Sequence, residues 1–501
     1  MTLRHVHFIA IAGTGMGSLA GLLKARGLEV TGSDENLYPP MSTALERWGI
    51  RVFPGFSPEH VLDRRPDLVV IGNAVRPTNP EAQAAIASGI RYVSFPDALH
   101  ELAIAGRHSV VIAGTHGKTT TTSLVGAVLL AAGCDPSLLV GGIAENFGGS
   151  FREGKGPHFV VEGDEYDTAF FDKTPKFLHY GARTAVVTSV EFDHADIYRD
   201  LDHVKESFRA LVAQLPEDGT LIAATDHPGV RDVIAGAPCR VVEYGVDAAA
   251  GGPPGTRGGP RAGGEPQARG GPRAGWRASS LEPGRAGTRF RVTRDGAVVG
   301  TALVPLHGRH NVENALAALV VADVLGVPPA EAIAGLATFR GVKRRQEVRG
   351  EVRGVTVLDD FAHHPTAVRE TIAAVRAGWP GRRLVAVFEP RTNTSRRKVF
   401  QADYAAAFDG ADLVVIAAVP DAPIYSATGE VTERFSAEEL ARDLQARGLS
   451  ARAIDGVGAI VDWLDLQLAP GDVVLAMSNG AFGGFWDELL KRLGQGEADE
   501  R

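Results

Sequence analysis

The chain has little cysteine, no excess of positive charge and no long apolar run. Cys134 and Cys239 are its only cysteines among 501 residues, which excludes a disulfide framework and fits a reducing compartment. The formal charge of −8 argues against a nucleic-acid-binding protein. No apolar run approaches the ~20 residues that span a bilayer, and the first residues lack the cleavage site of a secretory signal. We therefore expect a cytoplasmic protein with neither a nucleic-acid nor a membrane partner.

The remaining composition is that of a globular protein, with 44% hydrophobic and 22% charged residues. A length of 501 residues predicts several domains, at roughly 150 residues each. β-Branched runs alternate with helical segments along the chain, which predicts an α/β fold whose domains are built on largely parallel sheets with flanking helices. We expect domain boundaries at 1–106, 107–338 and 339–501.

A glycine-rich turn follows the predicted strand 110–112 and precedes a predicted helix over 123–132. The turn reads Gly114, Thr115, His116, Gly117, Lys118, Thr119 and Thr120. This is a GxxGK[ST] pattern, a shortened form of the P-loop. Backbone N–H groups and the helix dipole attract phosphate at such a turn. A lysine here reaches the outer phosphates and a threonine hydroxyl holds Mg²⁺, so the stretch predicts a phosphate-binding site.

A second glycine-rich turn lies at Gly13–Gly17, after a predicted strand over 7–12. The next strand, 29–34, ends in Asp34. Glycines here let the backbone approach a diphosphate, and the acid can bind a ribose hydroxyl, so this unit predicts nucleotide binding. The pattern is GxGxG rather than GxGxxG, and a tight turn without a ligand is the alternative.

Two acidic clusters follow predicted strands in the second domain. Glu162–Asp167 follows strand 158–161, and Glu191–His194 follows strand 185–188. Acids at the carboxyl ends of parallel strands beside a P-loop are placed to hold Mg²⁺. His194 is a further candidate ligand, since imidazole also suits Mn²⁺; a structural histidine is the alternative.

Residues from about 248 to 287 repeat Gly-Gly-Pro(-Arg) and are predicted to be a disordered insertion in the second domain. Alternating residues then resume on both sides of Asp295-Gly296, which predicts a β-hairpin. The helix that follows carries His310, Asn311 and Asn314. Asn side chains can donate and accept together, as an adenine edge requires, although helix capping is the alternative for Asn311.

The third segment contains strands whose carboxyl ends carry polar groups. These ends are Asp359–His364, Glu389–Asn393, Pro420-Asp421 and Ser478–Gly480. Helical segments separate the strands, so we expect another open parallel sheet with a functional edge.

The motifs Gly114–Thr120, Glu191–His194, Gly308–Asn311 with Asn314, and Asp359–Pro365 occur in the order found in the Mur ligase family, which this chain resembles over nearly its whole length. The resemblance implies three domains: a UDP-binding one, a central ATPase and a mobile amine-binding one. Segment 162–173 and Phe388–Arg391 are most similar to the branch that joins UDP-N-acetylmuramate to L-alanyl-γ-D-glutamyl-meso-diaminopimelate in peptidoglycan recycling. The branch that adds L-alanine is the alternative.

The reaction implied by the resemblance uses ATP and Mg²⁺, with Mn²⁺ as an alternative ion. ATP converts the carboxylate into an acyl phosphate, and the peptide amine displaces phosphate. The expected partners are these substrates alone, with the protein a monomer or weak homo-oligomer. A nucleotide-dependent oxidoreductase or a non-catalytic nucleotide switch are competing hypotheses, but the first leaves the P-loop unexplained.

The resemblance also implies residue roles. The catalytic residues that it implies are Lys118, His194, Arg345, Asp360 and His363. The implied ATP contacts are the P-loop, His310, Asn311, Asn314 and Arg344. The implied metal ligands are Thr119, Glu162 and His194. UDP contacts fall to Gly13, Thr14, Gly15, Met16, Gly17 and Asp34, and peptide contacts to Arg391 and Asn393. Phe208 occupies the position where several family members have a carbamylated lysine.

Overall fold

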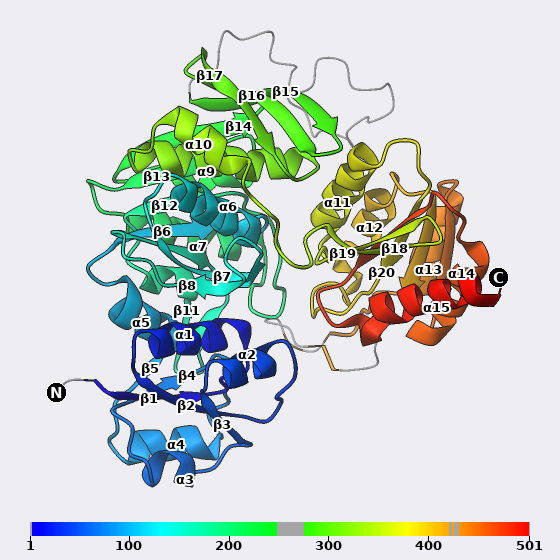
Figure 1. Cartoon of the computed structure of the whole chain (residues 1–501). Helices are drawn as coiled ribbons and strands as arrows, with labels where there is room; N and C mark the ends of the chain where they lie inside the picture. The colour runs from blue at the N-terminus through cyan, green and yellow to red at the C-terminus, as the bar shows by residue number, and fades with distance from the viewer. Residues whose placement is uncertain (1–2, 248–274, 420–422, 425–428, 430, 500–501) are drawn as a thin grey trace. The chain divides into compact units, whose positions relative to one another are not determined.

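A computed structural model describes residues 3–247, 275–419, 423–424, 429 and 431–499 (Figure 1). The chain divides into two compact units. The first comprises Met1–Ala223, His227–Val241 and Arg340–Lys343; the second comprises Ala224–Asp226, Val242–Phe339 and Arg344–Arg501. No helix among the described residues has the length and hydrophobicity needed to cross a membrane.

The first unit begins with a parallel sheet of strand order β3-β2-β1-β4-β5. Its strands are β1 His5–Ile9, β2 Glu29–Asp34, β3 Arg51–Pro54, β4 Leu68–Ile71 and β5 Tyr92–Ser94. Helices α1 (Thr14–Ala25) and α2 (Met41–Arg47) cover one face, and α3 (Glu59–Leu62) and α4 (Pro80–Ala87) cover the other (Figure 1). All four residues of β4 are buried, as expected for a strand covered on both faces.

Helix α5 (Phe95–Leu99) and a π-helical turn (His100–Ile104) lead into the P-loop region. Here β13, β12, β6, β9, β7 and β8 lie in that order in one sheet, parallel except for β8. Their bounds are β6 His108–Ala113, β7 Ser137–Ala144, β8 Gly149–Arg152, β9 His158–Gly163, β12 Thr184–Val187 and β13 Thr220–Ala224. The remaining elements of the first unit are α6 Lys118–Ala131, β10 Asp167–Ala169, β11 Asp172–Pro175, a 3₁₀ turn Lys176–His179, α7 Leu201–Ala213 and α8 Pro228–Ile234.

The second unit begins with strands in the order β17-β16-β15-β14, followed by α9 and α10. Their bounds are β14 Arg240–Val246, β15 Trp276–Gly284, β16 Gly287–Arg294, β17 Ala297–Val304, α9 Arg309–Val324 and α10 Pro329–Leu336. The predicted hairpin is confirmed: β16 and β17 pair antiparallel, and Asp295 and Gly296 both have positive φ, as a tight hairpin turn requires.

The prediction that the insertion extends to about residue 287 is wrong, because Trp276–Gly284 form β15. Trp276 and Ala278 are buried, and Arg277 pairs with Asp226 and Asp247 between them. Burial of these residues and the ion pairs of Arg277 stabilise a strand that the neighbouring Gly/Pro composition obscures in the sequence. Residues 248–274 of the predicted insertion lie outside the described residues, as do Pro420 and Asp421.

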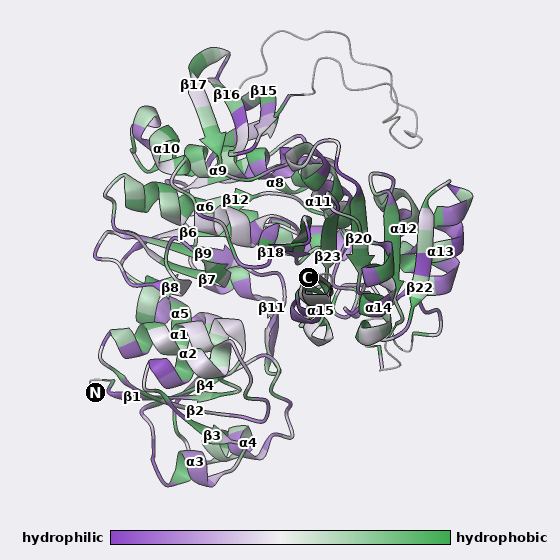
Figure 2. Cartoon of the chain, turned by 45° about the vertical axis from the view of Figure 1, so that its right-hand side comes forward, coloured by the Kyte–Doolittle hydropathy of each residue, from purple (hydrophilic) through white to green (hydrophobic). Residues whose placement is uncertain are grey.

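The last sheet has the order β18-β19-β23-β20-β21-β22, parallel except for β18. The bounds are β18 Glu347–Val352, β19 Val355–Asp360, β20 Leu384–Phe388, β21 Leu413–Ala417, β22 Ser450–Ile454 and β23 Val473–Met477. The helices are α11 Pro365–Gly378, α12 Gln401–Ala407, α13 Ala437–Ala446, α14 Val457–Gln467 and α15 Phe485–Asp499, with 3₁₀ turns at Lys398–Phe400 and Phe482–Gly484. Strand β20 is hydrophobic along its length (Figure 2), and α14 and α15 pack on one face of the sheet. The fold is α/β, as predicted.

Candidate active site

The P-loop lies between the end of β6 and the start of α6. Two of its residues must be glycine. Gly114 has φ +140°, and a Cβ there would lie 2.0 Å from the hydroxyl of Thr188. Gly117 caps α6 with φ 81°, a left-handed conformation that favours glycine. The turn therefore leaves the N-terminus of α6 in a geometry that can bind phosphate.

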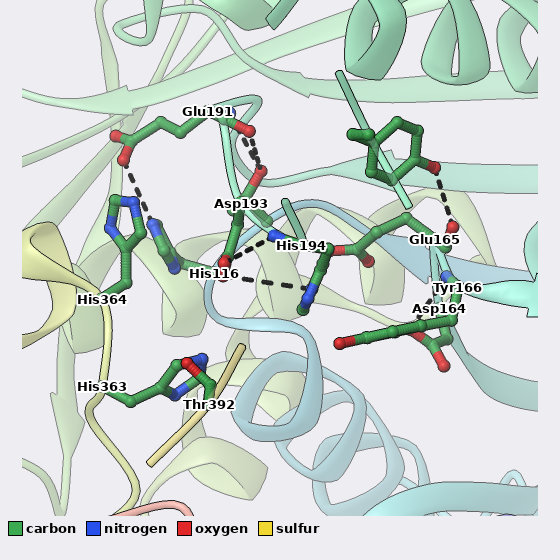
Figure 3. A network of polar contacts seen from close by, with 12 residues as sticks. His116, Asp164, Glu165, Tyr166, Glu191, Asp193, His194, His363, His364 and Thr392 are labelled. Carbon is green, nitrogen blue, oxygen red and sulfur yellow. Dashed lines mark hydrogen bonds and ion pairs between the residues drawn. The ribbon is translucent and has the colours of Figure 1, made fainter. Parts of the chain in front are cut away.

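Residues after β12 fix the P-loop backbone. The Thr115 amide donates to Ser189 O at 3.0 Å, and the His116 amide donates to Ser189 Oγ at 2.9 Å. The His116 ring lies 3.2 Å from Glu191 Oε2, and the two side chains point toward one another (Figure 3). Because β12 and β6 are parallel neighbours, the end of β12 supports the loop that follows β6.

Lys118 is held by a buried carboxylate that sequence reasoning did not assign. Its Nζ donates to both oxygens of Glu165, at 2.7 and 3.0 Å, and to Gly114 O at 2.7 Å. Burial is the largest single influence and would lower the pKa of Lys118, but the carboxylates of Glu165, Asp164 and Glu162 together outweigh it, so the pKa is raised. The ammonium group is therefore charged and directed into the P-loop. The acidic cluster at 162–167 was the sequence signal, but it did not distinguish Glu165 from its neighbours.

His194 contacts the same carboxylate. Its Nε2 lies 3.1 Å from Glu165 Oε1 and 4.0 Å from Asp193 Oδ2, so the ring stands between two acids (Figure 3). Burial opposes protonation, yet Asp193 and Glu165 raise the pKa of His194 to about 9. His194 also has φ 52°, a strained backbone conformation of the kind found at functional sites.

Asp164 and Lys176 form a second ion pair beside this site, with 2.6 Å between Lys176 Nζ and Asp164 Oδ2. Burial would raise the pKa of Asp164, but Lys176 and Lys118 lower it to about 2. Lys118, Asp164, Glu165 and His194 thus form one charged network. Phosphoryl transfer requires cationic side chains that face the negatively charged phosphate oxygens. A network of this kind can stabilise those oxygens where its cationic groups point toward them.

Thr119 and Glu162 fit a divalent cation. The Thr119 hydroxyl donates to Glu162 Oε1 at 2.9 Å, and Glu162 Oε2 accepts from the Gly141 amide at 2.7 Å. Hydroxyl and carboxylate oxygens are the ligands that Mg²⁺ prefers. Burial raises the pKa of Glu162, although the Gly141 amide and the charge of Lys118 oppose the shift. Phe208, at the position predicted to correspond to the carbamylated lysine of other family members, is fully buried against Phe177. Its side chain has no atom that could bind a metal ion.

The second glycine turn lies after β1. Gly13 caps α1, which begins at Thr14. A Cβ at Gly17 would lie 2.3 Å from the sulfur of Met41, so a larger residue there would displace the Met41 side chain. Met16 is buried in the core. Asp34 accepts from the amides of Ala12 and Asn36, both at 2.9 Å. Gly15 faces Phe95, so this turn is held from several sides.

The remaining predicted residues lie in the second unit. Asn311 donates to His307 O at 2.8 Å, and Asn314 donates to Asn311 Oδ1 at 3.3 Å; Gly308, not Asn311, caps α9. His310 lies 4.0 Å from Glu370, and burial lowers the pKa of its ring.

Arg344 and Arg345 differ in their surroundings. Arg344 donates to the carbonyl groups of Ser478 and Gly480 at 2.6 Å and lies 3.3 Å from the buried Asp359. Both guanidinium groups lie over the Phe361 ring, that of Arg345 at 4.9 Å and that of Arg344 at 5.6 Å from its centroid. Arg344 is thus an anchor of the last sheet.

Four more predicted residues belong to loops of the same sheet. Asp360 accepts from the amides of Gln346 and Ala362, both at 2.8 Å, and His363 Nδ1 lies 3.2 Å from Phe361 O. Asn393 accepts from Arg396 at 3.1 Å. Arg391 is exposed and lies against Gly480, where a Cβ would lie 1.7 Å from its guanidinium.

Comparison with known proteins identifies the family. Residues 5–107 match the Mur ligase family catalytic domain, residues 112–322 the Mur ligase middle domain, and residues 344–480 the Mur ligase glutamate ligase domain. The chain belongs to the Mur ligase family.

Individual relatives match over almost the full chain. A UDP-N-acetylmuramate–L-alanyl-γ-D-glutamyl-meso-2,6-diaminoheptandioate ligase of Escherichia coli K12 is 38% identical, over 97% of this chain and 98% of that protein. A UDP-N-acetylmuramate–L-alanine ligase of Sorangium cellulosum is 36% identical, over 95% and 94%. The crystal structure of a murein peptide ligase from Psychrobacter arcticus matches with a TM-score of 0.69 and 33% identity, over 98% and 99%. This Mur ligase is therefore an enzyme that forms an amide bond at the expense of ATP.

Proposed function

We propose that this Mur ligase joins the carboxylate of UDP-N-acetylmuramate to the amine of L-alanyl-γ-D-glutamyl-meso-diaminopimelate in peptidoglycan recycling. The single observation that carries the choice of amine is the 38% identity, across 97% of the chain, to the E. coli ligase of that name. We further propose that it acts in the cytoplasm as a monomer or weak homo-oligomer, with boundaries near residues 106 and 338.

The first chemical step has a physical requirement. A carboxylate is a poor electrophile, so the γ-phosphoryl group of ATP must be transferred to it before an amine can attack. In this proposal the amides of Gly114–Thr120 and the charge of Lys118 stabilise the phosphoryl group in transfer. Glu165, which holds Lys118 and His194 on one carboxylate, keeps both side chains directed at the P-loop.

Thr119 and Glu162 would hold Mg²⁺, or Mn²⁺, and His194 is proposed as a ligand of a second ion. A bound divalent ion would neutralise charge on the phosphates. His310, Asn311, Asn314 and Arg344 are proposed to contact ATP, and Arg345, Asp360 and His363 to serve catalysis. Gly13–Gly17 with Asp34 would bind UDP, and Arg391 with Asn393 the carboxylates of the peptide, since arginine binds such groups bidentately.

Phosphate release from ATP tests this proposal. Release should require UDP-N-acetylmuramate and the tripeptide together, and omission of either should leave only a background rate. Turnover with L-alanine but not with the tripeptide would overturn the choice of amine and keep the family. Amine-independent hydrolysis would instead indicate a nucleotide switch.

A further inference from the structure

Helix α4 carries a fully buried glutamate that takes no part in the proposed chemistry. The Glu81 side chain is 0% exposed. Its carboxylate accepts from His7 Nε2 at 2.6 Å, Ser33 Oγ at 2.9 Å, His60 Nδ1 at 3.1 Å and the Ser57 amide at 3.2 Å. A buried carboxylate is costly unless every lone pair is satisfied. Here four donors from three segments converge on it: β1, β2 and the stretch from Ser57 into α3.

The serine held by Glu81 supports the turn that follows β1. Ser33 O accepts from the amides of Ala10 and Ile11, at 2.9 and 3.1 Å. The next amide, that of Ala12, donates to Asp34 Oδ2 at 2.9 Å. Three consecutive amides thus bond to two consecutive residues of β2, and Ala10 has φ 66°, a conformation that an alanine adopts only when its surroundings impose it.

We propose that Glu81 is a positioning residue for the UDP-binding turn of this enzyme. Its carboxylate joins β1, through His7, to β2, through Ser33, and Ser33 in turn fixes the backbone that enters Gly13. The inference rests on the proposed function, because it assumes that this turn binds the UDP moiety.

The chemistry of the site requires a carboxylate. All four contacts are donors to Glu81, and both of its oxygens are used. A glutamine amide would present an N–H group to at least one of these donors, so one hydrogen bond would be lost and one donor left unsatisfied. The expected consequence is a displaced Ser33 and a turn that no longer holds one geometry.

A purely structural role for Glu81 is the competing explanation, and substrate affinities separate the two. General damage to the fold would weaken UDP and ATP binding together. A positioning role affects the UDP site, because the P-loop is fixed by the separate contacts of Ser189.

The experiment compares Glu81→Gln with Glu46→Gln, the same change at an exposed glutamate on helix α2. Calorimetric titration with UDP alone and with ATP gives both affinities, and steady-state kinetics give KM for UDP-N-acetylmuramate and kcat. In Glu81→Gln we expect the Kd of UDP and this KM to rise about fivefold or more, as loss of one charged hydrogen bond implies. The Kd of ATP and kcat at saturation should stay within about twofold, and Glu46→Gln should match the wild type in every value.

An unchanged UDP affinity in folded Glu81→Gln, or an equal loss of UDP and ATP affinity, would overturn the inference. Ser33→Ala, which removes only the hydroxyl contact, serves if Glu81→Gln does not fold: a weakened UDP affinity supports the inference and an unchanged one overturns it. If the wild-type enzyme turns over UDP-N-acetylmuramate and the variants bind UDP as tightly as the wild type, the role of Glu81 is contradicted but the proposed function is not. A wild type that binds no UDP contradicts the proposed function as well.

Discussion

Lys118 and His194 meet on the carboxylate of Glu165, although the three residues follow three different strands. Lys118 follows β6, Glu165 follows β9 and His194 follows β12, and the order β12-β6-β9 makes these strands neighbours. The sequence predicts that such strand ends converge. It does not predict which acid of 162–167 bonds to the lysine, because that depends on the path of the chain after β9.

Replacement of Lys118 tests the P-loop at this scale. Lys118→Ala removes the charge that the proposal assigns to the phosphoryl group, so kcat should fall by at least about a hundredfold. Glu165 keeps His194 as a partner, so the protein should still fold, as thermal unfolding would verify. Lys173→Ala, at a lysine whose side chain is 66% exposed, is the control and should leave kcat unchanged. A Lys118→Ala enzyme near the wild-type rate would remove the P-loop from the mechanism.

Replacement of Arg344 and replacement of Arg345 should affect the stability of the fold to different extents. Arg344→Ala leaves the buried Asp359 with a single cationic partner, Arg349, and should lower the free energy of unfolding by about 2–4 kcal/mol. Arg345→Ala should cost less than about 1 kcal/mol, as surface changes do, but should reduce kcat. Chemical denaturation and phosphate release measure the two quantities. The reverse pattern would show that the roles of the two arginines are exchanged.

At the scale of elements, most strands and helices follow from local patterns. The strands predicted over 110–112, 158–161 and 185–188 correspond to β6, β9 and β12. The helix predicted over 123–132 begins earlier, at Lys118. β15 was missed because Trp276 adjoins a Gly/Pro-rich stretch, and its strand conformation depends on pairing with β14 and β16, which no local pattern reveals. The predicted adenine-binding residues 310–314 do lie on the first turns of α9, but their ligand stays a prediction.

An ion pair between α5 and the 3₁₀ turn 176–179 should make stability depend on pH. His179 Nδ1 lies 2.8 Å from Asp97 Oδ1. The hydrogen bond to Asp97 raises the pKa of His179 above its ordinary 6.5, and that to His179 lowers the pKa of Asp97 below its ordinary 3.8. The pair therefore stabilises the fold fully between pH 3.8 and 6.5. This stabilisation is lost as pH rises through the raised pKa of His179, and as pH falls through the lowered pKa of Asp97.

His179→Gln should reveal this dependence. The difference in Tm from the wild type should be largest near pH 6 and shrink by pH 9. At pH 6 we expect about 1 kcal/mol or less, because Asp97 is partly exposed, which is roughly 2 °C. Asp97→Asn should give the same profile. A difference in Tm that does not vary between pH 6 and 9 would contradict an ionic origin.

For the whole molecule, the order of the motifs carries more information than any one of them. The P-loop alone predicts a phosphate site, and Gly13–Gly17 alone fits several nucleotide-binding proteins. Together with Glu191–His194, Gly308–Asn311 and Asp359–Pro365 they match three consecutive Mur ligase domains. The choice of amine follows from similarity along the whole chain. No single motif predicts the amine substrate, because specificity for a peptide depends on side chains that several loops bring together.

The central claim is that ATP activates the carboxylate of UDP-N-acetylmuramate for attack by the tripeptide amine. Substrate labelled with ¹⁸O in that carboxylate tests it directly, with the released phosphate analysed by mass spectrometry. An acyl phosphate transfers one carboxylate oxygen to phosphate, so the account predicts one ¹⁸O atom in each phosphate released during tripeptide ligation. Unlabelled phosphate, released at the rate of product formation, would contradict it.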